Sequence, residues 1–342
     1  MYQLKAGLTD SWQMRFLRTV KDNAEGLFTL STSRAWIAEL DRILYGHLVW
    51  VFDHAERTTE GFWGRSYLAN GKLKDRHVFQ LDQQCYPLLE LAEFLDSTTL
   101  ERSQARRWGR VIDEILQVLL TRKAPNKWVF QTSETPGDDP VSMQYHFSSN
   151  VLVWHTLRKL APYARTLRLR TPIDDWIDLI QFDTIEAFTT TYNDEPIFAY
   201  LCDLEGSFEI YHDANDLPSV FAPEWSFCSR EDPRWLNLFR FAFSRRNERA
   251  YFPTGEYYGL GSIHTTHPWP LGDAQEMIFA RICGDKEGLD DAKERTSKKM
   301  QWDGGFAEAN DEVTGEVRSK HWFSWPGSVI GAAFIDWTVD TH

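Results

Sequence analysis

Apolar side chains recur every three or four residues along most of this chain, which is the period of an amphipathic α-helix. In residues 33–54, behind a possible Thr32/Ser33 cap, the apolar face consists of Trp36, Leu40, Ile43, Leu44, His47, Leu48 and Val51. Residues 102–122 repeat the pattern with Trp108, Val111, Ile112, Ile115, Leu116 and Leu119. The same period predicts helices at 84–95, 148–163, 174–191, 234–245, 270–283, 288–300 and 326–337.

Two details of these helices follow from residue type. Pro87 is expected in the first turn of the 84–95 helix, where its missing N–H costs nothing. Asp174 or Asp175 is expected to cap the 174–191 helix.

Strand signal is scarce by comparison. Residues 197–211 are the one good case, with Gly206 at a turn, and predict a short β-hairpin. No glycine or proline run resembles an interdomain linker, and the connections between the helices are long. We therefore expect one all-α domain over residues 1–342, built as a ring of paired helices, with function carried by the loops.

Composition narrows the classes of partner. The formal charge of −13 disfavours nucleic acids and anionic membranes, but it does not disfavour neutral sugars. No apolar run is long enough to predict a membrane span. The N-terminus lacks the apolar core of a signal peptide, so we expect a cytoplasmic protein unless a targeting segment has been removed. The spacing of the four cysteines suits neither zinc nor a disulfide framework, which predicts free buried thiols.

Candidate chemistry is concentrated between Ser262 and Trp325. Glu308 lies there in a Gly-rich loop between two aromatic clusters, S-I-H-T-T-H-P-W and K-H-W-F-S-W. Aromatic faces can stack on the C–H surfaces of a sugar while a carboxylate activates water. A second acidic cluster, Asp138-Asp139, lies far upstream, and two separated carboxylates make glycoside hydrolysis the first hypothesis.

Each candidate also has a structural interpretation. Asp138 and Asp139 suit the first turn of a helix at 141–157, and Asp82 and Gln83 suit the cap of the 84–95 helix. Asp213 and Asn215 could contact a sugar or form a turn. Three histidines could contact a sugar, ligate a metal or have a structural role: His264, His267 and His321. Three tryptophans are open between sugar stacking and core packing: Trp302, Trp322 and Trp325.

Several segments, in order, resemble glycoside hydrolase family 125. They are V-F-Q-L-D-Q-Q-C-Y-P-L (78–88), T-P-G-D-D (135–139) with Asn150 eleven residues on, H-D-A-N-D-L-P-S-V (212–220), G-L-G-S-I-H-T (259–265), G-F-A-E-A (305–309) and W-F-S-W (322–325). The family consists of metal-independent exo-acting α-1,6-mannosidases with an (α/α)6 barrel. The resemblance runs from about residue 78 to the C-terminus.

The resemblance implies specific roles. Glu308 would be the general base of an inverting hydrolysis, and Asp139 or Asp138 the general acid. No metal or cofactor is implied, and the partner is an oligosaccharide or glycoside. The residues expected to contact the substrate are Arg65, Asp82, Gln83, Asp213, Asn215, His264, Thr265, Lys320, Trp322 and Trp325.

The chain also departs from the family pattern. An N-terminal Trp-Leu-Arg-Asp-Ser segment is missing, with Ala35-Trp36-Ile37 a poor substitute, which suggests a shortened first helical pair. Thr135 replaces an arginine, Ala307 a histidine and His212 an aspartate. The departures leave two alternatives open: a glycosidase of the same fold acting on another α-sugar, and a non-catalytic carbohydrate-binding or scaffold protein that retains the barrel. If the chain is an enzyme, we expect at least three of five residues to line one pocket with Glu308: Arg65, Asp82, Gln83, His264 and Lys320.

Overall fold

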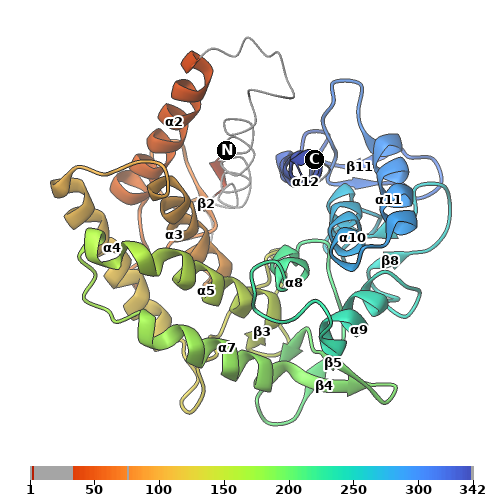
Figure 1. Ribbon diagram of the computed structural model, residues 1–342, viewed down its shortest axis with the longest axis horizontal. Helices are drawn as coiled ribbons and strands as arrows, with labels where there is room; N and C mark the ends of the chain where they lie inside the picture. The colour runs from red at the N-terminus through yellow and green to blue at the C-terminus, as the bar shows by residue number, and fades with distance from the viewer. Residues whose placement is uncertain (1, 4–33, 75–76, 340–342) are drawn as a thin grey trace. The chain divides into compact units, whose positions relative to one another are not determined.

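The computed structural model describes residues 2–3, 34–74 and 77–339, with side chains described at 42–74 and 77–331. These residues form mainly α-helices, accompanied by short antiparallel β-ribbons (Figure 1). The chain divides into two compact units. Unit 1 comprises Met1–Lys123, Thr156–Ile177 and Gly331–His342, and unit 2 comprises Ala124–His155 and Asp178–Ile330.

Unit 1 is built around three long helices, α2 (Arg34–Val49), α3 (Leu81–Leu95) and α4 (Arg102–Thr121). The smaller elements are β1 (Tyr2–Gln3), the π-helical turn η1 (Trp50–His54), β2 (Ser66–Tyr67), the 3-10 turn η2 (Ala161–Tyr163) and α6 (Ala164–Leu167). β1 pairs antiparallel with β2. Gly109 lets α4 cross α6 closely, since a Cβ at this position would lie 1.9 Å from the Leu167 carbonyl oxygen.

Unit 2 alternates helices with ribbons. Its helices are α8 (Leu217–Phe221), α9 (Pro233–Ala242), α10 (Pro270–Cys283) and α11 (Lys286–Lys299). Its strands are β3 (Tyr145–His146), β4 (Thr189–Tyr192), β5 (Glu195–Phe198), β6 (Leu201–Cys202), β7 (Phe208–Glu209), β8 (Tyr251–Phe252), β9 (Gly259–Leu260), β10 (Ala309–Asn310) and β11 (Val317–Ser319). All pairings are antiparallel: β3-β6-β7, β4-β5, β8-β9 and β10-β11. Three helices cross the boundary between the units: α5 (Phe147–Leu160), α7 (Asp174–Phe188) and α12 (Ser324–Val339).

Local sequence explains several helix ends in unit 2. Asp232 caps α9 by accepting a hydrogen bond from the Arg234 N–H at 2.9 Å, and Pro233 occupies the first helical position. Asp285 caps α11 through the Gly288 N–H at 3.0 Å. Gly284 ends α10 with a φ of 71°, a conformation that glycine adopts without strain.

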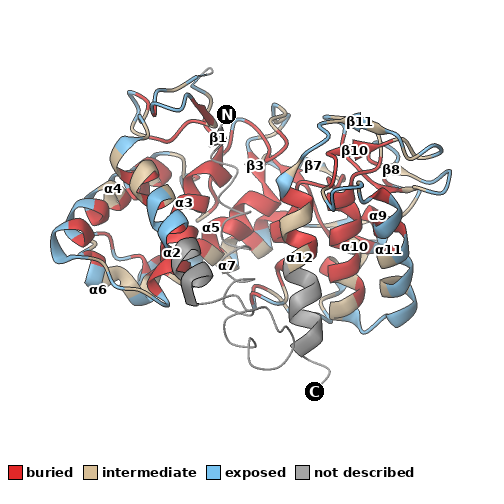
Figure 2. Cartoon of the chain, turned by 90° about the horizontal axis from the view of Figure 1, so that it is seen from above, coloured by how far each residue is buried: buried red, intermediate tan, exposed pale blue. Residues whose placement is uncertain are grey.

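Helices α10 and α11 lie side by side and differ in burial. α10 is buried over most of its length, whereas α11 exposes one face (Figures 1 and 2). A buried ion-pair network joins them. Asp273 of α10 accepts a hydrogen bond from Arg295 at 3.0 Å and forms an ion pair with Lys299, whose Nζ lies 2.7 Å from Oδ2, and all three side chains are almost completely buried. The pairing compensates charges that would otherwise be costly to bury.

Most predicted helices are confirmed to within a few residues, and the exceptions are instructive. The helix expected at 84–95 begins at Leu81, so Pro87 lies inside α3 rather than in its first turn. Asp82 and Gln83 are likewise inside α3, so the alternative that they cap this helix is wrong. The proposed Thr32/Ser33 cap lies outside the described residues, and Ala35-Trp36-Ile37 lies in α2 where only the backbone is described.

The predicted hairpin is confirmed in its second half. β6 and β7 pair across a turn in which Gly206 has a φ of 107°. Residues 195–198 form β5, which pairs antiparallel with the preceding strand β4, so the region contains two separate ribbons. The thiols are free as expected, and Cys85 and Cys202 are buried, but Cys283 is exposed and Cys228 is half-buried. No described helix is long and apolar enough to cross a membrane.

Candidate active site

The acidic pair of unit 2 lies in a tight turn. The Thr135 N–H donates to the Asp139 carbonyl at 2.8 Å, and the Asp138 N–H donates back to the Thr135 carbonyl at 3.0 Å. Asp138 takes a φ of 69°, which aspartate and asparagine tolerate better than most residues. The next helix, α5, begins only at Phe147, so the predicted helix at 141–157 starts too early. The interpretation of this pair as a helix cap is therefore wrong.

Two residues fix the surroundings of this turn. Asn150 is buried in α5, accepts from the Phe130 N–H at 2.7 Å and donates to the Phe130 carbonyl at 3.0 Å. A Cβ at Gly137 would lie 3.1 Å from both Asn215 Nδ2 and Asp139 Oδ2. Glycine at 137 thus permits the close approach of Asn215 to the acidic turn.

A histidine from a distant loop contacts the acidic turn. His264 Nδ1 lies 3.2 Å from Asp139 Oδ1, and both side chains are partly exposed. The pKa of His264 is raised, first by this hydrogen bond and further by the charges of Asp139, Glu308 and Asp138. The three carboxylates therefore each stabilise the protonated form of the His264 imidazole.

Glu308 is almost completely buried, at 2% exposure, directly before β10. Its backbone N–H lies 3.1 Å from the carbonyl oxygens of both Ser319 and Lys320, which fixes the segment. The carboxylate has three side-chain partners: Lys320 Nζ at 2.5 Å from Oε1, Ser319 Oγ at 2.5 Å from Oε2, and Thr265 Oγ1 at 3.5 Å from Oε2. An ammonium ion and two hydroxyl groups thus compensate a buried negative charge.

The loop 264–265 links the two acidic elements. His264 contacts Asp139, and the next residue, Thr265, contacts Glu308. The Thr265 carbonyl accepts from the Trp269 indole N–H at 2.9 Å, and this hydrogen bond holds the loop to the start of α10. The fold therefore brings together four predicted site residues: Asp139, His264, Thr265 and Glu308, with Lys320 beside the last.

Asp213 is part of a buried network rather than an exposed sugar ligand. Its Oδ1 accepts from the Asn215 backbone N–H at 2.9 Å and side-chain amide at 2.7 Å, which confirms the turn-forming interpretation. Its Oδ2 accepts from the hydroxyls of Tyr211 and Ser262, both at 2.7 Å. Burial, and then the charge of Asp216, raise the pKa of Asp213 to about 6. The network shapes the 213–215 turn, and through it the position of Asn215.

Sequence reasoning missed the supporting hydroxyls. Ser319, Tyr211 and Ser262 each donate to a predicted site carboxylate. Ser319 and Ser262 act on carboxylates 11 and 49 residues away, so no local pattern marks them, and Tyr211 lies two residues from Asp213 in a stretch without regular secondary structure. Of the three, only Ser262 lies in one of the two aromatic clusters that flank Glu308 in the sequence, where it is the first residue of S-I-H-T.

A possible metal-ligating group lies outside this site. One ligand atom each of His267, Asp311 and Glu312 lie within 4.8 Å of one another. The oxygens of Asp311 already accept from Arg318 at 2.6 Å and from the backbone N–H groups of Val313 and Thr314 at 3.0 and 2.8 Å. These hydrogen bonds and the guanidinium charge oppose a cation at this position.

Other predicted contact residues differ in burial. Trp325 is buried at 3% exposure, whereas Trp322 is 74% exposed. Arg65, Asp82 and Gln83 belong to unit 1, where Asp82 and Gln83 are fully buried and Arg65 is half-buried. A shared pocket of these three residues with Glu308 stays a prediction.

The comparison with protein families gives one match. The model described as metal-independent α-mannosidase, glycoside hydrolase family 125, matches residues 127–335. This range contains Asp139, His264, Glu308 and Lys320. No curated protein matches the chain.

Solved structures share the fold at low identity. A Streptococcus pneumoniae metal-independent α-mannosidase, in a non-productive complex with α-1,6-mannobiose, matches with 20% identity, a TM-score of 0.71 and coverage of 97% of this chain and 95% of the other. A bacterial glucoamylase in complex with acarbose matches with 14% identity and a TM-score of 0.66, over 96% of this chain and 48% of the other. A family 63 mannosylglycerate hydrolase from Thermus thermophilus matches with 12% identity and a TM-score of 0.56, over 96% and 92%. The predicted all-α, six-hairpin glycosidase fold is confirmed.

Proposed function

Because this chain belongs to glycoside hydrolase family 125, the metal-independent α-mannosidases, we propose that it removes a terminal α-linked mannose with inversion. Family membership makes it a glycoside hydrolase. The identity of the sugar, the stereochemistry and the roles of individual residues are our proposals. One observation supports them most: adjacent residues of one loop, His264 and Thr265, contact the two carboxylates that the reaction requires.

Glu308 acts in this proposal as the general base. It removes a proton from a water molecule whose oxygen attacks the anomeric carbon on the face opposite the leaving group. Lys320, Ser319 and Thr265 hold the carboxylate in one orientation, which favours a fixed direction of proton transfer. The glycosidic C–O bond breaks as the new bond forms, so the released sugar has the opposite anomeric configuration.

Asp139 acts as the general acid, donating a proton to the leaving oxygen. His264 supports the assignment to Asp139 rather than Asp138, since its imidazole lies 3.2 Å from Asp139 Oδ1 and can exchange a proton with it. The inverting mechanism predicts carboxyl groups of Glu308 and the acid roughly 6.5–9.5 Å apart across one pocket.

The substrate is proposed to be an α-1,6-linked mannoside, because α-1,6-mannobiose is bound by the S. pneumoniae relative. Asn215, His264, Thr265 and Lys320 are the unit 2 residues that we propose contact the reacting sugar. We propose that Asp213 acts indirectly, because its Oδ1 accepts from the backbone and the side chain of Asn215 and so positions that residue. Arg65, Asp82 and Gln83 stay predicted substrate contacts.

A panel of α-linked disaccharides and aryl α-glycosides, followed by NMR at the anomeric proton, tests the proposal. Hydrolysis of α-1,6-mannobiose with first appearance of β-mannose is expected. First appearance of α-mannose would exclude inversion. Preference for another sugar would favour the alternative that Thr135 and Ala307 have changed the specificity, and no hydrolysis across the panel would favour a non-catalytic carbohydrate-binding protein.

A further inference from the structure

Two tryptophans of unit 2 are unusually exposed. Trp302 is 93% exposed and Trp322 is 74% exposed, whereas five other tryptophans are fully buried: Trp63, Trp108, Trp154, Trp235 and Trp269. Exposing large indole rings to water carries a free-energy cost that core packing would remove. Tryptophan is also the residue type most enriched among binding hot spots. Exposed aromatic rings grouped at one place therefore indicate a binding surface.

Hydrogen bonds group the two residues. The Trp322 indole N–H donates to Asp303 Oδ2 at 2.7 Å, and Gln301 Nε2 donates to the His321 carbonyl. The turn that carries Trp302 is closed by the Gln301 N–H donating to the Gly305 carbonyl at 2.9 Å. Segment 301–305 is thus held against segment 321–322, and each of the two segments carries one of the exposed tryptophans.

The junction continues into the segment that holds Glu308. The Phe323 N–H donates to the Phe306 carbonyl at 2.9 Å, and the Glu308 N–H lies 3.1 Å from the Ser319 carbonyl. Trp302 precedes Glu308 by six residues, which limits their Cα separation to roughly 20 Å. An oligosaccharide whose reacting sugar lies beside Glu308 can therefore extend several sugar units and reach Trp302.

The chemistry of the surface suits carbohydrate. Indole faces pack against the C–H faces of sugar rings, and the Asp303 carboxylate beside Trp322 offers an acceptor for a sugar hydroxyl. The Asp303 hydrogen bond fixes the orientation of the Trp322 ring, so less conformational entropy is lost when a ligand binds.

We propose that Trp302 and Trp322 form a second carbohydrate-binding surface that holds a distal mannose residue of a long or branched glycan. The inference rests on the proposed function for the identity of the sugar. It assigns Trp322 to the distal part of the substrate rather than to the reacting sugar. Holding the distal end raises the effective concentration of the chain end at the catalytic site.

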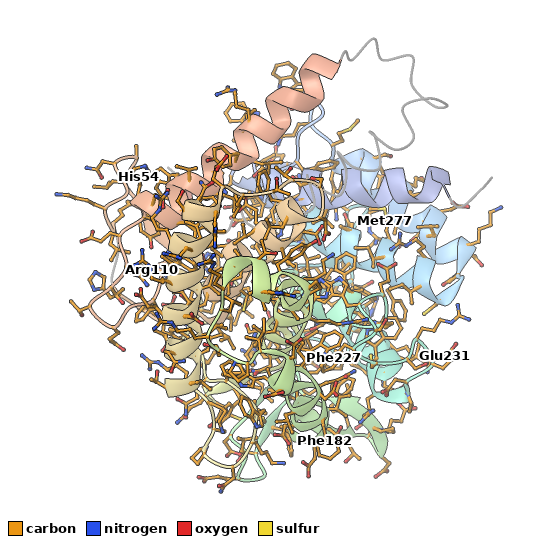
Figure 3. The ribbon with its side chains drawn as sticks, turned by 60° about the vertical axis from the view of Figure 1, so that its left-hand side comes forward. His54, Arg110, Phe182, Phe227, Glu231 and Met277 are labelled. Atoms are coloured by element: carbon orange, nitrogen blue, oxygen red, sulfur yellow. The ribbon has the colours of Figure 1, made fainter. Side chains whose placement is uncertain are left out.

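Binding is measured by calorimetry with α-1,6-linked mannobiose and mannotetraose, in a Glu308→Gln background that blocks hydrolysis. We expect Trp302→Ala and Trp322→Ala each to weaken mannotetraose binding by about tenfold and mannobiose binding by much less. Phe182→Ala is the matched control, because Phe182 (labelled in Figure 3) is 68% exposed on α7 and belongs to neither segment that carries the two tryptophans. Trp302→Phe should restore part of the affinity, since it keeps an aromatic face.

Three outcomes would overturn the inference: equal losses for the two sugars, no loss for either, or no saturable mannotetraose binding by the parent. Ultracentrifugation of the same variants tests for a different occupant of the surface. If the parent is a dimer, and Trp302→Ala dissociates it without changing the affinity for sugar, a second copy of the chain covers the surface. Turnover of mannobiose by the unsubstituted protein is measured separately. Absence of turnover would refute the proposed hydrolysis, while the binding comparison would still decide the role of the tryptophans.

Discussion

His264 Nδ1 lies 3.2 Å from Asp139 Oδ1 although the two residues are 125 positions apart in the sequence. The contact joins the loop before α10 to the acidic turn before α5. The same loop meets Glu308 through Thr265, so one short segment connects both proposed catalytic carboxylates. The position of this loop is therefore central to the predictions below.

Asp139→Asn is expected to lower turnover of α-1,6-mannobiose by about two to four orders of magnitude, because the leaving oxygen loses its proton donor. Turnover of α-mannosyl fluoride should fall much less, since fluoride leaves without protonation. Asp138→Asn is the matched control, and asparagine also tolerates the φ of 69° at this position. A larger and leaving-group-dependent loss in Asp138→Asn would transfer the acid role to Asp138.

Glu308→Gln is expected to fold normally and to lose about three or more orders of magnitude in turnover. The amide keeps the shape of the side chain but cannot accept a proton from water. Circular dichroism and the melting temperature check the fold. A variant that keeps about a tenth of the parent rate would show that Glu308 is not the base.

Lys320→Met is expected to reduce turnover by about tenfold or more, because it removes the ammonium group 2.5 Å from the Glu308 carboxylate. Lys320→Arg keeps the positive charge and should retain most of the activity. The melting temperature of Lys320→Met should fall, because the buried Glu308 carboxylate loses its charged partner and keeps only the Ser319 and Thr265 hydroxyls, so turnover is compared at a temperature where all variants are folded. Equal activity in the methionine and arginine variants would exclude a role for the charge.

The pH dependence of stability should carry the signature of Asp213, whose pKa is raised by burial from 3.8 to about 6. The native state then holds a proton that the unfolded chain has lost, so this contribution to stability is full below about pH 4 and disappears as the pH rises through 6. The free energy of unfolding of the parent, relative to Asp213→Asn, should fall by roughly 2–3 kcal/mol between pH 4 and 7.

Urea titrations of the two proteins at each pH provide the measurement. Asp203→Asn is a control of opposite sign, since hydrogen bonds from Ser207 and Glu205 lower the pKa of the exposed Asp203. The contribution of Asp203 should be present above its ordinary pKa and lost at lower pH. Identical pH profiles for the parent and Asp213→Asn would contradict the assignment.

Chelator is expected to change neither the rate of hydrolysis nor the melting temperature. Asp311 belongs to the candidate cluster with His267 and Glu312, and its oxygens accept from the Thr314 backbone N–H and from Arg318, which lower the pKa of this carboxyl. Activity lost in EDTA and restored by calcium would overturn the metal-independent mechanism.

Helical periodicity predicted most of the helices because an amphipathic helix must keep its apolar residues on one face. The ribbons were largely missed, because strands of two to four residues are too short to show an alternating pattern. The beginning of α3 was also misplaced. Pro87 suggested a first turn, but the helix extends back to Leu81, and Pro87 is accommodated in its interior.

For the candidate site, too, the sequence predicted some features and missed others. The sequence identified Glu308, Asp139, His264, Thr265 and Lys320 from motifs that each lie within a short stretch of chain. It paired Glu308 with Asp139 or Asp138 by their roles, but it could not give the contacts that join them, and its alternative interpretation of Asp138 and Asp139 as a helix end is wrong. It also gave no sign that Ser319 donates to Glu308, or that Tyr211 and Ser262 donate to Asp213.

Residue type and spacing thus determined by themselves the helical class of the fold, the family resemblance and the kinds of side chain available for chemistry. The tertiary structure decided which of these side chains meet and which tryptophans are exposed. The physical reason is the separation in sequence over which each interaction acts. Helix periodicity and capping depend on neighbours three or four residues away, whereas side-chain contacts between loops and the burial of side chains depend on the position of distant segments. His264 and Asp139, 125 residues apart, become partners only when the chain has folded.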